Sequence, residues 1–162
     1  REPLPGIFDT FLIGPNMNCE FPNENPTSTE IAEILRTTKT IAVVGLSPKP
    51  ERPSHSVSAY MKSQGYTIIP INPGHPEILG ETCYASLNDV PGPVDMVNIF
   101  REPSAVPEIV NQAIAKKAKV IWMQEGIVHN QAAETARAAG LKVVMNKCLY
   151  QEHRQAAKAS RS

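Results

Sequence analysis

The feature that most constrains the fold is a strand–loop–helix pattern in the first half of the chain. Ile41–Val44 is an uninterrupted apolar run, which is typical of a strand buried on both faces of a sheet. The run breaks at Gly45 into a proline-rich loop, and Pro53 then opens a helix that Gly65 ends. Backbone N–H groups and the positive end of the helix dipole would meet above this loop. The stretch therefore predicts an anion site, of the kind that holds phosphate groups.

Strand and helix patterns alternate along the rest of the chain. Further strands are predicted at Tyr66–Ile71, Val94–Phe100, Val120–Met123 and Leu141–Met145. Further helices are predicted at Ser28–Thr37, from Ser104 onward, at Asn130–Ala139 and at Leu149–Ala159. Crossovers between parallel strands are right-handed and place helices on both faces of a sheet. The pattern predicts an α/β fold, a Rossmann-like doubly wound parallel sheet of about five strands in a single domain.

Three segments follow from this pattern. Residues 1–26 are rich in proline and lack periodicity, so we expect an irregular arm. Residues 27–153 form the predicted Rossmann-like domain, and residues 154–162 a C-terminal tail. The arm carries apolar residues between Ile7 and Ile13, which need cover from the domain or from a neighbouring subunit. This leaves room for a homodimer.

The charge balance excludes several kinds of partner. Sixteen Lys and Arg residues balance sixteen Asp and Glu residues, which disfavours nucleic acid and an anionic membrane surface as partners. No apolar run approaches the about 20 residues that span a bilayer, and the start does not resemble a signal peptide. The three cysteines are widely spaced and odd in number, which fits reduced thiols. We expect a cytoplasmic protein with a small-molecule ligand.

The phosphate loop departs from the dinucleotide-binding pattern. Such folds use G-x-G-x-x-G and an acidic residue after the second strand, but this loop keeps only Gly45, and the second strand is followed by Asn72. Both departures weigh against NAD. The cations Lys49, Arg52 and Arg101 favour a ligand with more phosphate charge.

Six segments in order resemble the small stand-alone CoA-binding proteins of bacteria and archaea, which are similar to the CoA-binding domain of the succinyl-CoA synthetase alpha subunit. They are Val43–Ser54, Ile71–Pro73, Ile78–Leu87, Val94–Arg101, Trp122–Gly126 and Val144–Cys148. The resemblance runs from about Glu30 to His153 and implies coenzyme A or acyl-CoA as the ligand. In the synthetases a ligase domain with a phosphorylated histidine follows. This chain ends before one, so we do not expect synthetase chemistry.

Position by position, the resemblance implies a ligand site at the strand ends. The diphosphate would meet the loop and helix start at Gly45, Leu46, Ser47, Pro48, Arg52 and Ser54. The adenosine end would lie beside Asn72, Pro73, Phe100 and Arg101. The pantetheine arm would pass Gln124 and Gly126. Asn146 and Gly74 stand where the family often has an acidic and a basic residue.

No catalytic constellation is visible, so binding is the expected activity, in a carrier, sensor or regulatory role. Glu125 is a single carboxylate without a partner in the pattern, and Cys148 and His153 have poor spacing for a metal site. One alternative is an NAD(P)-binding oxidoreductase or redox sensor. Others are a CoA-binding subunit of a split acyl-CoA synthetase and a nucleotide fold that binds only protein. The acyl group and the pathway stay open.

Overall fold

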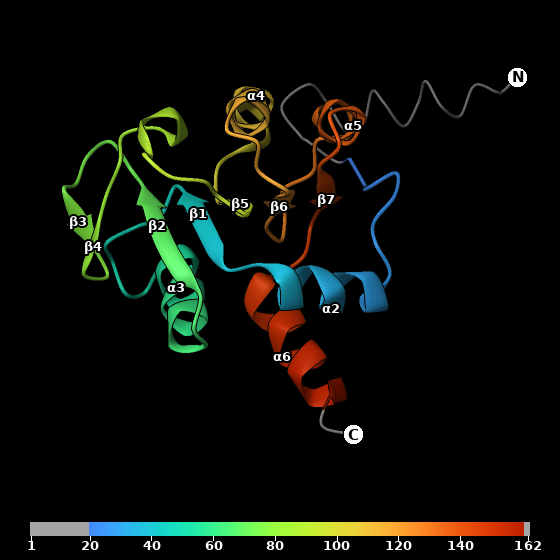
Figure 1. Ribbon diagram of the computed structural model, residues 1–162, viewed down its shortest axis with the longest axis horizontal. Helices are drawn as coiled ribbons and strands as arrows, with labels where there is room; N and C mark the ends of the chain where they lie inside the picture. Colours follow the sequence, from blue (N-terminus) through green and yellow to red (C-terminus); the bar gives the residue numbers. More distant parts are fainter. Residues whose placement is uncertain (1–19, 161–162) are drawn as a thin grey trace, which may run out of the picture.

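A five-stranded parallel sheet in the order β2-β1-β5-β6-β7 forms the centre of the computed structural model, which describes residues 20–160 (Figure 1). The strands are β1 (Thr40–Val44), β2 (Thr67–Ile71), β5 (Met96–Ile99), β6 (Val120–Met123) and β7 (Lys142–Val144). The predicted Rossmann-like fold is confirmed. The chain passes from β1 to β2 on one side and later to β5 on the other. The strand order therefore reverses at β1 and β5, where sheets of this type hold their ligands.

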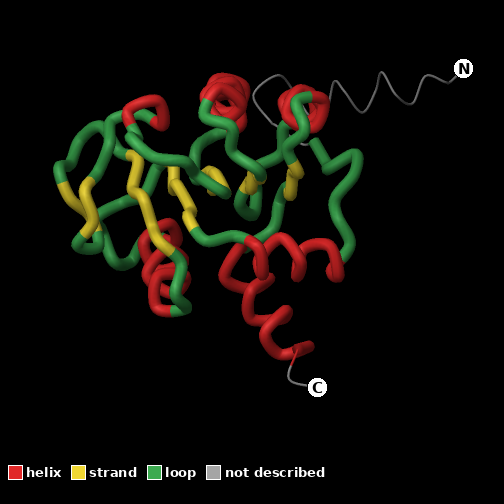
Figure 2. The backbone as a smooth tube through the Cα atoms, in the orientation of Figure 1, coloured by secondary structure: helices red, strands yellow, loops and turns green. Residues whose placement is uncertain are grey.

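Helices cover both faces of the sheet (Figures 1 and 2). One face carries α4 (Val106–Ala115) and α5 (Asn130–Ala138), and the other carries α2 (Ser28–Thr37), α3 (Pro53–Ser63) and α6 (Leu149–Ser160). Short 3-10 turns lie at Leu87–Asp89 and Pro103–Ala105. A capping box of Thr27 and Glu30 opens α2, and Pro53 opens α3 as expected. Helix α6 continues across the boundary that the sequence suggested at residue 153.

Two apolar cores follow from the alternation of side chains along each strand. Val97 and Ile99 of β5 pack with α4 and α5, in what we call the α4/α5 layer. Met96 of β5 and Trp122 of β6 pack in a second core with Val57 and other residues of α2, α3 and α6, which we call the α3/α6 layer. Since neighbours along a strand face opposite sides, Asn98 must share the side of Met96. This places a polar side chain in the α3/α6 layer.

The two outer strands are each contacted by a second segment. A small antiparallel hairpin of β3 (Glu77–Ile78) and β4 (Glu81–Thr82) leads to Tyr84, which pairs with Ile71 at the end of β2. Beyond β7, the side-chain amide of Asn25 both donates to and accepts from the backbone of Met145. The apolar residues of the predicted arm, from Ile7 to Ile13, lie outside the described residues.

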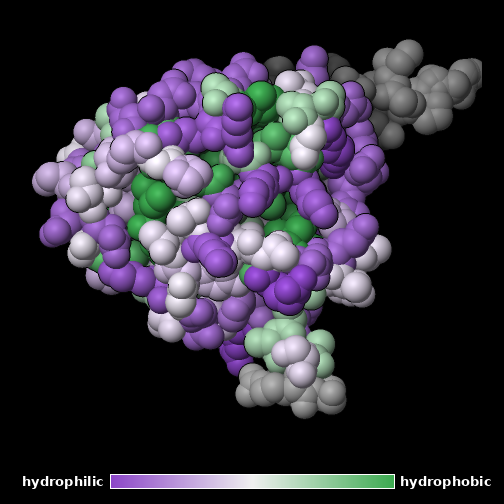
Figure 3. Space-filling view, in the orientation of Figure 1, coloured by the Kyte–Doolittle hydropathy of each residue, from purple (hydrophilic) through white to green (hydrophobic). Residues whose placement is uncertain are grey.

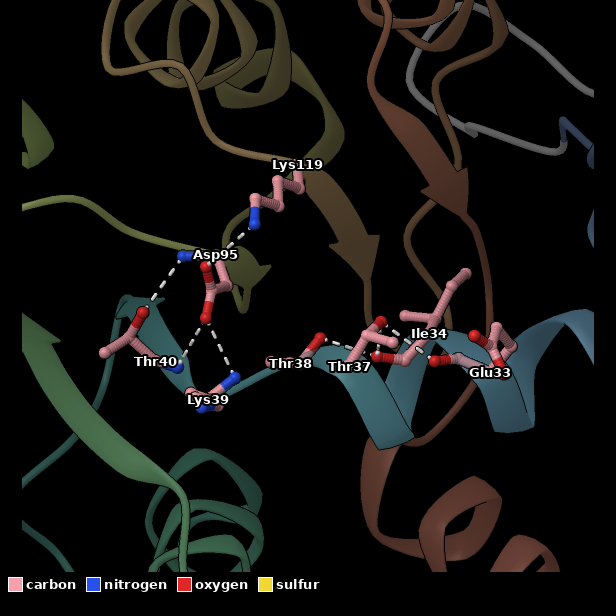
Figure 4. Close-up of polar contacts among 8 residues, drawn as sticks. All are labelled: Glu33, Ile34, Thr37, Thr38, Lys39, Thr40, Asp95 and Lys119. Carbon is pink, nitrogen blue, oxygen red and sulfur yellow. Dashed lines mark hydrogen bonds and ion pairs between the residues drawn. The ribbon is translucent and has the colours of Figure 1, made fainter.

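The amino ends of the strands form what we call the amino edge of the sheet. There, a hydrogen-bond network surrounds Asp95, just before β5 (Figure 4). The Asp95 carboxylate accepts hydrogen bonds from the backbone N–H groups of Lys39 at 2.9 Å and Thr40 at 3.1 Å. The Thr40 hydroxyl accepts one in return from the Asp95 N–H at 3.0 Å. Lys119 lies 3.9 Å away on the other side. Partial burial opposes ionisation, but these bonds hold the pKa of Asp95 below its usual value.

The surface shows small apolar patches separated by polar side chains on the face in Figure 3. Phe21 is the one large apolar side chain that is widely exposed within residues 20–160, at 79%. Within that same range, every helix is too short or too polar to cross a bilayer.

Candidate functional site

Gly45 joins the end of β1 to the loop in a conformation that few other residues could adopt. Its φ is +91°, in the left-handed region that favours glycine. A Cβ atom at this position would lie 2.9 Å from the carbonyl oxygen of Phe100 and 3.2 Å from the Cδ of Arg101. The ends of β1 and β5 therefore approach each other so closely that only glycine fits between them. This brings the loop after β1 beside Phe100 and Arg101, as predicted.

Some backbone N–H groups of the loop donate hydrogen bonds within the described protein, and others, which we call unengaged, do not. The Gly45 N–H donates to the carbonyl of Ile71 at 3.0 Å, and the Ser47 N–H donates to the Ser54 hydroxyl at 3.0 Å. Pro48 has no N–H. The N–H groups of Leu46 and Ser54 have no hydrogen-bond partner in the described part of the chain. Leu46 is one of the predicted phosphate donors, and the N–H of Ser54 belongs to the first turn of α3; both residues are buried, at 0% and 5% exposure.

Ser54 plays a structural part that the sequence did not reveal. It is buried, at 5% exposure, and its hydroxyl holds the Ser47 N–H. The Ser47 hydroxyl in turn accepts from the Lys49 N–H at 3.1 Å. The two predicted hydroxyl ligands thus shape the loop, although each can still donate its own proton.

Three cationic side chains lie around the loop, and they differ in their ion pairing. Lys49 and Arg52 are exposed, and within residues 20–160 neither has a carboxylate partner. Arg101 instead makes two hydrogen bonds of 3.1 Å to Glu102, which raise the pKa of the Arg101 guanidinium. Lys49 and Arg52 are therefore the cations open to an anionic ligand, whereas Arg101 would have to exchange its partner.

Asn72, predicted to flank the adenosine, braces the loop. Its Nδ2 donates to the carbonyl of Leu46 at 2.9 Å, and its Oδ1 accepts from the N–H of Gly74 at 2.8 Å. Its own N–H donates to the carbonyl of Tyr84. The side chain links the end of β2 to the phosphate loop, while Pro73 beside it is exposed.

Gln124 and Gly126, at the end of β6, join the site to the last helix. Gln124 is 5% exposed, and its Oε1 accepts from the N–H of Leu149, the first residue of α6, at 3.1 Å. The Gly126 N–H donates to the Oδ1 of Asn146 at 2.7 Å. Trp122 is fully buried, and its indole N–H donates to the carbonyl of Lys147 at 2.8 Å.

Helices α3 and α6 are tied together by an aromatic cluster. The Tyr60 hydroxyl lies 2.8 Å from the Nδ1 of His153, and the rings of Tyr60 and Tyr66 both meet the His153 ring edge to face. Burial lowers the pKa of His153. An open groove of about 550 Å³ lies between the same two helices, but its walls include none of the predicted ligand residues.

The structure brings most predicted site residues to the carboxyl ends of the strands, which we call the carboxyl edge of the sheet. Those after β1, β2, β5 and β6 all lie at the carboxyl ends of the strands, as parallel pairing requires. The doubtful pairing of Cys148 and His153 gains no further ligand, because residues 20–160 contain no group of three or more His, Cys, Asp or Glu that could hold a metal ion. Sequence reasoning overlooked Asn98, whose signal was a polar residue inside the apolar strand Val94–Phe100.

Comparison with known proteins identifies the family. A family model described as a CoA binding domain matches residues 39–154. The uncharacterized protein YneT of Bacillus subtilis is 42% identical over 130 residues, which cover 80% of this chain and 96% of YneT. A hypothetical protein from Pyrococcus horikoshii has a similar structure, with a TM-score of 0.81 and 40% identity over 87% of this chain and 99% of that one.

Much longer proteins also match. An acetate–CoA ligase (ADP-forming) of Archaeoglobus fulgidus is 30% identical over 121 residues, which cover 68% of this chain and 18% of the ligase. The shared unit is thus a minor part of that enzyme. Since the family model spans most of the sheet and its helices, the chain belongs to the CoA-binding domain family.

Proposed function

We propose that this protein binds coenzyme A or acyl-CoA at the carboxyl edge of its sheet and acts without catalysis, as a carrier, sensor or regulator. The observation that carries the proposal is the pair of N–H groups without a partner in the described residues, that of Leu46 in the loop and that of Ser54 at the start of α3. N–H groups at a helix start attract phosphate, and the dipole of the helix adds to this attraction. Membership of the CoA-binding domain family supports the choice of ligand.

The charges around the loop support the same placement of the phosphate groups. Among residues 20–160, Lys49 and Arg52 have no carboxylate partner. Arg52 directly precedes α3, where a cation is unfavourable unless an anion is present. A CoA diphosphate over this loop would accept hydrogen bonds from the backbone N–H groups and would lie beside the two cationic side chains. The pantetheine arm would then pass Gln124 and Gly126, and the adenosine would lie toward Asn72 and Phe100.

The test is a binding titration with CoA, acetyl-CoA, dephospho-CoA, NADH and NADPH, followed by calorimetry and thermal unfolding. We expect CoA and acetyl-CoA to bind and to raise the unfolding temperature, because a ligand that binds only the folded state stabilises it. NADH should bind weakly, since the loop has one glycine and the Asn72 side chain is engaged by Leu46 and Gly74. Tight NADH binding without CoA binding would reverse the proposal.

A second candidate function is favoured by the size of the relatives. The acetate–CoA ligase of Archaeoglobus fulgidus shares only 18% of its length with this chain. The domain described here corresponds to that unit, and it could supply CoA binding to a separate partner in a split acyl-CoA synthetase. The test is to add purified protein to candidate ligase subunits. CoA-dependent ATP turnover that requires both proteins would support this role over simple binding.

A further inference from the structure

Asn98 is a buried amide in an otherwise apolar strand, one residue before the end of β5. Its side chain is 1% exposed, and neither its Nδ2 nor its Oδ1 has a hydrogen-bond partner within the described residues. Buried amides are almost always hydrogen bonded, because removing them from water unpaired is strongly unfavourable. Both ends of this amide therefore need a partner close to the candidate ligand site.

The flanking strands do not supply that partner. Asn98 lies in register between Val43 of β1 and Trp122 of β6, and both of these side chains are buried in the α3/α6 layer. Val43 has no polar side-chain atom. The one N–H of the Trp122 indole is used, since it donates to the carbonyl of Lys147. The partner must therefore lie between the sheet and the helices of this layer.

Ser58 is the second unpaired polar group in that layer. It lies on α3, is 1% exposed, and its hydroxyl has no partner among residues 20–160. Ser58 follows Ser54 by one helical turn, and Ser54 holds the loop through the Ser47 N–H. One turn is about 5.4 Å along a helix, and two residues are about 6.6 Å along a strand. Ser58 therefore lies about as far below the loop as Asn98 lies below Phe100.

We propose that Asn98 and Ser58 bind ordered water between β5 and α3, directly beneath the phosphate loop. A buried water forms two to four hydrogen bonds, so ordered water can accept from the Asn98 Nδ2, donate to the Asn98 Oδ1 and donate to the Ser58 hydroxyl. Such a bridge joins α3 to the switch-point strand. Since the first turn of α3 holds the loop, Asn98 and Ser58 act as positioning residues for the Leu46 and Ser54 N–H groups. This role rests on the proposed function, whereas the water site itself does not.

The decisive experiment compares Ser58→Thr with Ser58→Val. Threonine and valine have the same shape and crowd the site equally, but only threonine keeps a hydroxyl. With water bound, the valine variant should unfold about 3 °C below the threonine variant, because it removes one partner of the water. In a dry site the order reverses, since threonine would bury an unpaired hydroxyl. The matched control is the same pair of changes at exposed Ser63 on α3, where the order should not depend on Asn98.

A second variant and a crystal structure complete the test. Asn98→Leu should lower the unfolding temperature if water is bound and raise it if the site is dry. A high-resolution crystal structure of the unliganded protein should show water density within hydrogen-bond distance of both side chains. A direct bond between Asn98 and Ser58, with no such density, would overturn the water site.

Ligand binding then tests the positioning role. CoA should bind several-fold more weakly to Ser58→Val than to Ser58→Thr, and equal affinities would overturn that role. If wild-type protein fails to bind CoA at all, the proposed function is wrong, whereas the unfolding and crystallographic results still decide the water site. The two failures are therefore distinguishable.

Discussion

The backbone N–H groups at the amino edge and at the carboxyl edge of the sheet differ in their hydrogen bonding. At the amino edge, the Asp95 carboxylate accepts hydrogen bonds from the N–H groups of Lys39 and Thr40, and the Thr40 hydroxyl accepts one from the Asp95 N–H. At the carboxyl edge, the N–H groups of Leu46 and Ser54 stay without partners in the described protein. One edge is satisfied internally, and the other keeps unengaged donors at the candidate site. The difference shows how a single sheet can separate stability from binding.

The side chains at the carboxyl edge brace the site and leave it unfilled. Asn72 fixes the carbonyl of Leu46, and Gln124 fixes the N–H of Leu149. Both hold backbone in place beside the loop, but neither engages the donors of Leu46 or Ser54. These braces hold the loop in one conformation, with its unengaged N–H groups on residues that are themselves buried.

The largest expected effect comes from Gly45→Ala, which attacks the carboxyl edge directly. The new Cβ would meet the Phe100 carbonyl at 2.9 Å in a backbone conformation with φ of +91°. We expect a loss of about 3 kcal/mol in unfolding free energy, measured by urea denaturation, together with loss of CoA binding.

Gly65→Ala is the matched control for that change. Gly65 also has a positive φ, of +100°, but its Cβ would have no atom within 4 Å. It should lose only about 1 kcal/mol. Equal losses at the two glycines would show that the close approach of β1 and β5 has no energetic importance.

Asp95→Asn tests the amino edge. Removing the charge should lower the unfolding free energy by about 2 kcal/mol, because hydrogen bonds to a charged acceptor are stronger than neutral ones. The affinity for CoA should not change. Since the folded pKa of Asp95 is lowered, its contribution is complete above the unfolded pKa of about 4 and disappears as the pH falls through the folded value. Loss of CoA binding in this variant would contradict the separation of the two edges.

Arg52→Ala tests the carboxyl edge without disturbing the fold. Arg52 is exposed and makes no side-chain cap bond, so the unfolding free energy should stay unchanged. The affinity for CoA should fall about tenfold, or about 1.4 kcal/mol. Equal losses for CoA and dephospho-CoA would place Arg52 on the diphosphate, and a loss confined to CoA would place it on the 3′-phosphate. Arg36→Ala, at an exposed pair with Glu33, should leave binding unaffected.

The smallest effect concerns His153, which links α6 to α3 behind the site. Burial lowers its folded pKa, so the protein loses stability as the pH falls from the unfolded value of about 6.5 through the folded value. Tyr60 and Tyr66 pack edge to face against this ring, Tyr60 also hydrogen bonds to it, and Tyr150 packs against Tyr60. His153→Phe should flatten the slope of unfolding temperature between about pH 7 and pH 5. An unchanged slope would assign it to other groups.

Local patterns made most of the fold predictable. Thr27 with Glu30 marked the start of α2, Pro53 marked that of α3, and apolar runs marked the strands. These signals lie within a few residues of what they determine. The edge that holds the candidate site followed from the rule that parallel strands place their ends together.

Contacts between distant residues were not predictable. The bond from Gln124 to Leu149 joins residues 25 positions apart, and that from Asn25 to Met145 joins residues 120 apart. No periodicity encodes such pairs. For the same reason the sequence did not reveal that the Asn72 amide braces Leu46, and the predicted contact of Asn72 with adenosine stays a prediction. The sequence selected polar residues near the site but could not divide them into those that support it and those that remain open.

The hydrogen bond between Gln124 and Leu149 has a mechanical consequence. It fastens the start of the final helix to the strand beside the candidate site, while the contact between Tyr60 and His153 holds the same helix against α3. A fused tag, an attached domain or a bound partner that tilts α6 would therefore act on both attachments.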